Sequence, residues 1–228
     1  MQSKDRTYQV VAIVGLIVGV MALTIGFAAF TTTLTIQSAA EVAPGAQTLD
    51  VVFSTSSSSV AAGSVSGVAS GESGASGASA TLSGTSITGI QANFTKPGQT
   101  VTYTFNVYNN SAYTAYLNEV IFKNVTGSSP AAFKVCSAKS GSANPATNNI
   151  DTACNGITLT LTVDDLSTTT SKTPSEILAL GNKTIAASVG KTVTVVIEYA
   201  TGSAVPDGDI SVAFGDIELK YSSVAPSA

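Results

Sequence analysis

Apolar and polar residues alternate with a period of two along much of the chain. The clearest runs place their apolar residues at Val101, Tyr103, Phe105 and Val107, at Leu159, Leu161 and Val163, and at Val193, Val195, Ile197 and Tyr199. This alternation is typical of strands with one face in a core and the other in water. Turn residues such as Pro97-Gly98 separate the runs, and no helix of ordinary length is indicated after residue 30. The pattern predicts an all-β fold, an antiparallel β-sandwich of the jelly-roll kind.

The alternation changes phase near the end of the chain. Ile210, Val212 and Phe214 are apolar at even positions, whereas Ile217, Leu219 and Tyr221 are apolar at odd positions. Gly215-Asp216 lies at the change. We expect either a bulge or a sharp corner there, because both halves can then face the core.

Residues 54–89 have a different composition, rich in Ser, Gly, Ala and Thr. Small polar side chains bury little apolar area, so we expect mostly loop or a mobile edge here, with one or two weak strands. The run Leu49, Val51 and Phe53 precedes this segment and predicts a first strand. Residues 54–89 are therefore interpreted as an insertion within one domain, residues 49–228.

The N-terminus contains an uncharged apolar segment. The 23 residues from Tyr8 to Phe30 carry no charge and follow Lys4 and Arg6. A helix of this length is about 34 Å long, enough to cross a bilayer. The preceding bases favour a cytoplasmic N-terminus, which places the rest of the chain outside. Residues 1–30 are thus predicted to be a signal peptide or a membrane anchor, and the sequence leaves cleavage and retention both open.

Composition excludes several classes of function. The chain has 228 residues, no His, two Cys and a formal net charge of -4, with only 11% charged residues. Catalysis by a Ser-His-Asp triad and zinc sites with His ligands both require imidazole. Nucleic-acid binding requires clustered bases, which an acidic chain of this kind lacks. We therefore expect no cofactor, no nucleic-acid partner and no enzymatic activity.

The two cysteines, Cys136 and Cys154, lie 18 residues apart in a polar segment. On an exported chain an even pair favours a disulfide, with two buried thiols as the alternative. A redox-active pair would more typically show the C-x-x-C spacing. We predict a structural disulfide.

Two further groups of polar residues are candidate sites. Asp207 and Asp209 flank a glycine after a proline, a pattern typical of turns that could also supply oxygen ligands to calcium. No other metal site is predicted. The N-x-S/T sequence, which becomes a glycosylation candidate if the source is archaeal, occurs at Asn93, Asn109, Asn124 and Asn182.

Several of these segments together resemble a known family. The apolar segment ends in Gly26-Phe27-Ala28-Ala29-Phe30, a Pro97-Gly98-Gln99-Thr100-Val101 sequence opens a strand, and Tyr108-Asn109-Asn110 ends it. In these features the chain resembles the TasA/camelysin family of exported bacterial proteins and the related archaeal bundling pilins. The resemblance implies a jelly-roll domain and cleavage near residues 28–30. Camelysin is described as a metalloprotease, but the absence of His means that this activity does not carry over.

The resemblance also implies polymerisation, in which the N-terminal strand of one subunit completes the sheet of another copy. The donor would lie at residues 31–42 within an N-terminal segment 31–48, with Leu34 and Ile36 as anchors. Alternatively, this segment is a stalk or the first strand of its own domain.

Three functions follow, in order of preference. The first is a structural protein of the cell surface or matrix that assembles into fibres or pili. The second is a monomeric surface domain, an adhesin or envelope component, anchored in the membrane by residues 8–30. The third, an exported enzyme, is the least supported, because the chain shows no convergent acid cluster and few of the aromatic residues that line substrate pockets.

Overall fold

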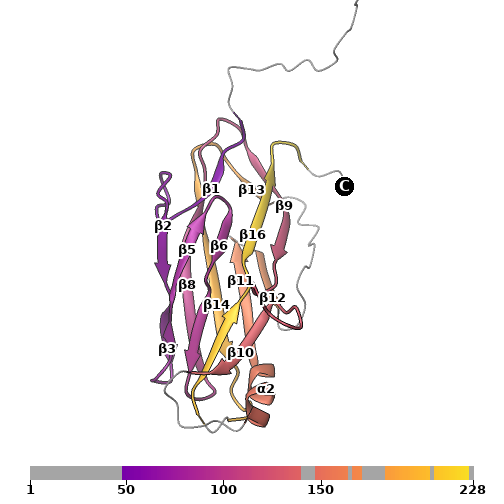
Figure 1. Ribbon diagram of the computed structural model, residues 1–228. Coiled ribbons are helices and arrows are strands. Elements are labelled where there is room, and N and C mark those ends of the chain that lie inside the picture. Colours follow the sequence, from indigo (N-terminus) through magenta and orange to yellow (C-terminus); the bar gives the residue numbers. More distant parts are fainter. Residues whose placement is uncertain (1–47, 140–146, 164–165, 171–182, 206–207, 226–228) are drawn as a thin grey trace, which may run out of the picture. The chain divides into compact units, whose positions relative to one another are not determined.

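The computed structural model describes residues 48–139, 147–163, 166–170, 183–205 and 208–225 (Figure 1). Residues from Gln47 to Ala228 form one compact unit. The predicted apolar segment 8–30 and the candidate donor 31–42 lie outside the described residues. Within the described ranges no helix is long and apolar enough to cross a membrane.

Antiparallel strands make up most of this unit, in three sheets. The first, the β8 sheet, has the strand order β1-β8-β14-β11-β12, and β3 also pairs with β8. Its strands are β1 (Val51–Ser54), β3 (Val68–Gly71), β8 (Gln99–Asn109), β11 (Ile157–Val163), β12 (Leu166–Thr170) and β14 (Gly190–Tyr199). The three alternating runs of the sequence form its centre, β8, β14 and β11, as the period-two pattern predicts.

The second sheet, the β16 sheet, has the order β13-β9-β16-β6-β5-β2. It comprises β2 (Gly63–Ser66), β5 (Ser79–Ser83), β6 (Ser86–Thr88), β9 (Ala115–Phe122), β13 (Thr184–Ile185) and β16 (Ile217–Ser222). The third, the β15 sheet, has the order β10-β15-β7-β4. Its members are β4 (Ser76–Gly77), β7 (Gln91–Phe94), β10 (Lys134–Ala138) and β15 (Ile210–Phe214).

One hydrophobic core is shared by the three sheets. Tyr103 of β8, Leu219 of β16 and Val212 of β15 are all completely buried in it. Aromatic rings pack edge-on within the core, for example Phe53 against Phe105 with ring centroids 4.8 Å apart. The inward residues of each strand supply the core because successive side chains of a strand point to opposite faces.

The phase change at Gly215-Asp216 is a corner between two sheets. Strand β15 ends at Phe214 in the β15 sheet, and β16 begins at Ile217 in the β16 sheet. The Gly215 N–H donates to the carbonyl of Phe133 at 2.8 Å, and the Lys123 N–H donates to the carbonyl of Asp216 at 2.8 Å. The alternating apolar side chains of both halves are buried, except for the half-buried Tyr221, so the corner is the second of the two expected geometries.

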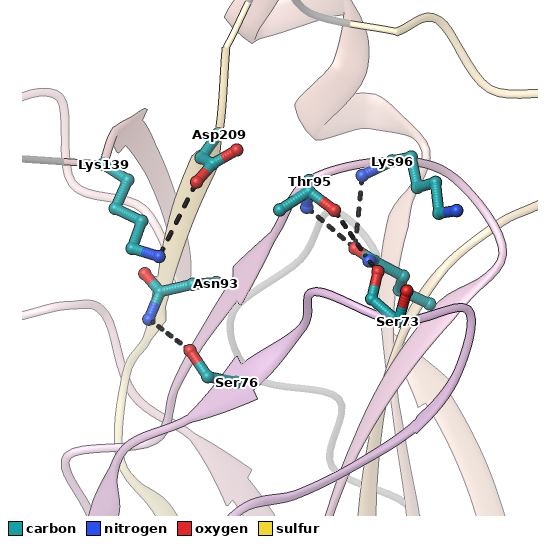
Figure 2. A network of polar contacts seen from close by, with 8 residues as sticks. Ser73, Ser76, Asn93, Thr95, Lys96, Lys139 and Asp209 are labelled. Carbon is teal, nitrogen blue, oxygen red and sulfur yellow. Dashed lines mark hydrogen bonds and ion pairs between the residues drawn. The ribbon is translucent and has the colours of Figure 1, made fainter. Parts of the chain in front are cut away.

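The Ser/Gly-rich segment is more ordered than predicted. Five strands, β2 to β6, lie within residues 54–89, where one or two were expected. Buried Ala80, Leu82 and Ile87 attach β5 and β6 to the core. The buried side chain of Gln99 adds a polar anchor, donating to the Ser73 carbonyl at 2.7 Å and accepting from the Thr95 N–H at 2.7 Å (Figure 2). Strands this short need few apolar residues, so the composition of the segment led to an expectation of fewer strands.

A short helix, α2 (Thr147–Asn155), contains the second cysteine and is absent from the sequence-based prediction. Ile150 and Ala153 of α2 are buried. Cys154 near its end is disulfide-bonded to Cys136 of β10, which confirms the predicted pair. The bond and the buried face hold the helix against the domain.

Candidate functional site: an open slot between β1 and β16

An open hollow of about 270 Å³ separates strand β1 from strand β16. Its walls are Leu49 and Val51 on the β1 side, Leu219, Lys220 and Tyr221 on the β16 side, and Thr85 at the turn between β5 and β6. We call this hollow the slot. Leu219 is completely buried and Val51 nearly so, while Leu49 is partly buried against the core. The slot is thus an opening between two sheets onto largely apolar side chains.

Within the described part of the chain, the backbone of Val51 has no partner on the side of β1 that faces the slot. Val51 is opposite Asn109 in the register, but the Asn109 N–H donates to Val189 and its carbonyl accepts from Ser188, both in the segment before β14. The bonds between β1 and β8 therefore involve the neighbours of Val51, as in the Asn110 N–H donating to the Asp50 carbonyl at 2.8 Å. Because alternate residues of a strand direct their backbone groups to opposite sides, the N–H and C=O of Val51 face away from β8.

Among the described residues, no partner is found for the backbone of Tyr221 on the side of β16 that faces the slot. Strand β6, the neighbour of β16, pairs only with Ile217 and Glu218. Beyond them the Leu219 N–H donates to the carbonyl of Thr85 at 3.0 Å, where the chain turns away. Opposite Tyr221 on the other side is Leu117, whose N–H donates to Lys183 rather than to β16. The backbone groups of Tyr221 consequently face the slot.

The turn between β5 and β6 closes one end of the slot. The Phe53 N–H donates to the carbonyl of Gly84 at 2.5 Å, and Thr85 accepts from Leu219. This turn bridges β1 and β16, so the opening lies beyond it, toward Leu49 and Tyr221. The geometry can accept a short extended segment, which would find backbone donors and acceptors on its flanks and apolar side chains beneath it.

Charge at the slot is small and locally paired. Lys220 forms an ion pair with Glu119 of β9, with Nζ and Oε2 3.0 Å apart. Lys123 and Glu218 form a second pair nearby on the same sheet, at 2.8 Å. The hydrogen bond to Glu218 is the main cause that raises the pKa of Lys123 above its ordinary value. Neither pair places an uncompensated charge in the slot.

Two asparagines hold the end of β8 and the start of β1. Asn109 is completely buried, and its side-chain amide donates to the carbonyls of Tyr113, Ile185 and Ala186 at 2.6–3.2 Å. Asn110 donates from its side chain to the carboxylate of Asp50 at 2.7 Å. The Asn109-Asn110 pair, identified from sequence as a strand end, therefore positions the residues next to the slot.

Of the two calcium candidates, Asp207 and Asp209, only Asp209 lies within the described residues. Asp209 is half-exposed and pairs with Lys139 at 3.6 Å (Figure 2). In the described part of the chain, no group of three or more His, Cys, Asp or Glu side chains is placed to hold a metal ion.

The four glycosylation candidates differ in accessibility. Asn109 is completely buried and its side-chain nitrogen donates to three carbonyls, so a glycan has no access to it in the folded domain. Asn124 is exposed, and Asn93 is half-buried with its amide donating to Ser76 Oγ at 3.2 Å (Figure 2). Asn182 lies outside the described residues, as do the candidate anchors Leu34 and Ile36.

Sequence reasoning identified the strands that border the slot but not the slot itself. Val51, Leu219 and Tyr221 are visible as members of alternating runs. That β1 and β16 face each other across an opening depends on which strands pair, and pairing between residues so distant in sequence leaves no local signal.

No family model, curated protein or solved structure matches this chain.

Proposed function

We propose that this protein is an exported structural subunit of the cell surface or extracellular matrix, which polymerises into fibres or pili by strand addition. Its domain would be a jelly-roll β-sandwich whose slot receives a strand from another copy. The observation that carries the proposal is the pair of unpaired strand edges, at Val51 of β1 and Tyr221 of β16, beside apolar side chains.

The physical basis is completion of an open sheet. A strand that enters the slot forms main-chain hydrogen bonds with the exposed edges, and its alternate side chains reach the core. Main-chain bonds supply affinity, while the apolar side chains select the register. An open strand edge beside apolar residues is otherwise prone to unspecific association, which favours a dedicated occupant.

Residues 31–42 of another copy are the donor that we propose. Leu34 and Ile36 alternate there with Thr33, Thr35 and Gln37, so one face of the extended segment is apolar. Leu34 and Ile36 would enter the slot and the threonines would face water. The resemblance to the TasA/camelysin family and the archaeal bundling pilins, based on the segment endings and the Pro97-Gly98 strand opening, supports the same assignment.

Export is supported by two independent features. The uncharged segment 8–30 is long enough to cross a bilayer, and Lys4 and Arg6 precede it. The disulfide between Cys136 and Cys154 is the form that cysteines take in oxidising compartments. We place the protein at the cell surface or outside the cell, tethered to the membrane if the apolar segment is retained.

The test compares donor variants in the source cell. Leu34→Asp and Ile36→Asp would place a carboxylate in the slot, and electron microscopy of cell-surface material should then show loss of fibres. Thr33→Asp and Thr35→Asp carry the same charge on the opposite face and are the matched controls, which should retain fibres. Fibres in all four variants would contradict the proposed donor.

The intact mass of the protein from native surface material distinguishes the fibre subunit from the alternative, a membrane-anchored surface domain. A mass lacking the residues up to about Phe30 leaves the donor segment free, as polymerisation requires. A full-length mass together with a monomeric state would instead favour the membrane-anchored surface domain.

A further inference from the structure

The hydroxyl group of Tyr221 is buried and has no hydrogen-bond partner in the structure. Among the described residues, every other buried side-chain oxygen or nitrogen has a hydrogen-bond partner. Other buried tyrosines are satisfied, since Tyr103 donates to the carbonyl of Gln91 at 2.5 Å and Tyr199 donates to that of Ala204. Buried polar groups in native proteins nearly always have a partner, which is ordered water when no protein group is in reach.

A small cavity adjoins this side chain. Leu117, Val163 and Ile185 line it together with the polar residues Lys183, Thr184 and Lys191. The centre of a water molecule can move within a volume of about 10 Å³ in this cavity. That volume corresponds to one water, and a cavity requires polar partners to hold it.

We infer that one buried water molecule occupies this cavity and is hydrogen-bonded to the Tyr221 hydroxyl. The cavity volume selects the ligand, because about 10 Å³ suits a single water and is tight for a larger ion such as chloride. Polar groups of Lys183, Thr184 or Lys191 complete the coordination of the water, which typically forms about three hydrogen bonds in such sites.

The water has a consequence for the slot. Tyr221 lines both the cavity and the slot, so one residue forms part of both walls. A water bonded to its hydroxyl fixes the ring that an entering strand would contact. This consequence rests on the proposed function, whereas the water site itself does not.

The first test is a crystal structure of the exported protein, from crystals grown with bromide in place of chloride. We expect density for one water at about 2.8 Å from the Tyr221 oxygen, with no anomalous bromide signal in the cavity. Bromide in the cavity, an empty cavity, or a protein group bonded to the hydroxyl would each overturn the inference.

The second test measures urea unfolding of Tyr221→Phe. If a water satisfies the hydroxyl, the variant loses a hydrogen bond and its folding equilibrium constant falls about fivefold. If the hydroxyl is unpaired, its removal leaves stability equal or higher, and the inference fails. Tyr116→Phe, at a half-buried tyrosine on β9, is the matched control and should leave the constant unchanged. Neither test requires fibres, so failure of polymerisation would leave the result on the water site intact.

Discussion

Gly215 passes so close to Lys123 that a Cβ atom built on the glycine would lie 1.8 Å from the lysine carbonyl oxygen. The contact lies at the corner where the chain leaves the β15 sheet for the β16 sheet. Gly215→Ala must therefore displace backbone rather than a flexible side chain. We expect a loss of about 2–4 kcal/mol in the free energy of unfolding, measured by urea denaturation.

Gly63→Ala provides the control for this substitution. A Cβ on Gly63 would lie 3.4 Å from the methyl group of Thr55, an ordinary contact on the edge strand β2. The free energy of unfolding of the Gly63→Ala variant should differ from that of the wild type by less than about 0.5 kcal/mol. Equal effects at Gly63 and Gly215 would show that the corner tolerates a side chain.

The disulfide between Cys136 and Cys154 should contribute substantially to stability. Its loop of 18 residues corresponds to about 3 kcal/mol of loop-closure entropy in the unfolded chain. The Cys136→Ser/Cys154→Ser double variant should lose that amount in urea denaturation and become insensitive to reductant. Wild-type protein that unfolds at the same urea concentration with and without reductant would contradict the expectation.

The strands and the corner were predictable because their signals are local. Period-two alternation marked β8, β11 and β14, and the shift from even to odd positions marked the corner at Gly215-Asp216. Helix α2 was missed because it is short and polar and has only two buried apolar residues, Ile150 and Ala153.

The slot was not predictable, for a different reason. The slot exists because β6 begins at Ser86, opposite Glu218, whereas the antiparallel strand β16 continues beyond Glu218 to Ser222. The length difference between two paired strands depends on tertiary contacts, such as the turn at Gly84 that bonds to Phe53. No spacing in the sequence encodes it.

Asn109 should be among the most sensitive polar residues of the domain. Asn109→Ala would remove the buried bond from the Asn109 amide to the Ile185 carbonyl and would leave the buried N–H of Ser111 without its acceptor, Asn109 Oδ1. Unsatisfied buried groups cost about 1–3 kcal/mol each, so we expect a loss of roughly 3 kcal/mol or more in urea denaturation. Asn124→Ala, at an exposed asparagine, is the control and should leave stability unchanged. Comparable stability in the two variants would contradict the role of Asn109.

Stability should depend little on pH near neutrality and fall under alkaline conditions. The chain has no His, so no side chain of ordinary pKa titrates between about pH 6 and 8. Burial raises the pKa values of Tyr103, Tyr199 and Tyr221 above the ordinary value of 10.0. The unfolded chain therefore releases the protons of these tyrosines at lower pH than the folded domain does. Their contribution to the free energy of unfolding is complete below pH 10 and is lost as pH rises through the folded-state pKa values.

Urea denaturation at a series of pH values checks this expectation. The free energy of unfolding should be flat from about pH 6 to 9 and decline above about pH 10. Tyr221→Phe should make the decline shallower, since one titrating group is removed. A stability that rises above pH 10, or an unchanged slope in the variant, would contradict the assignment.

The unpaired N–H of Val51 allows the acceptor edge to be tested separately from the donor. Val51→Pro removes the N–H that faces the slot without removing a bond to β8, and proline is tolerated on edge strands whose N–H faces outward. We expect a folded domain, with stability lowered by about 1 kcal/mol or less, that no longer forms fibres in electron micrographs. Val52→Pro is the contrasting variant, because Val52 pairs with Tyr108 and the substitution removes a bond within the β8 sheet; it should destabilise the domain itself. Wild-type fibre formation by folded Val51→Pro would show that the β1 edge does not receive the strand.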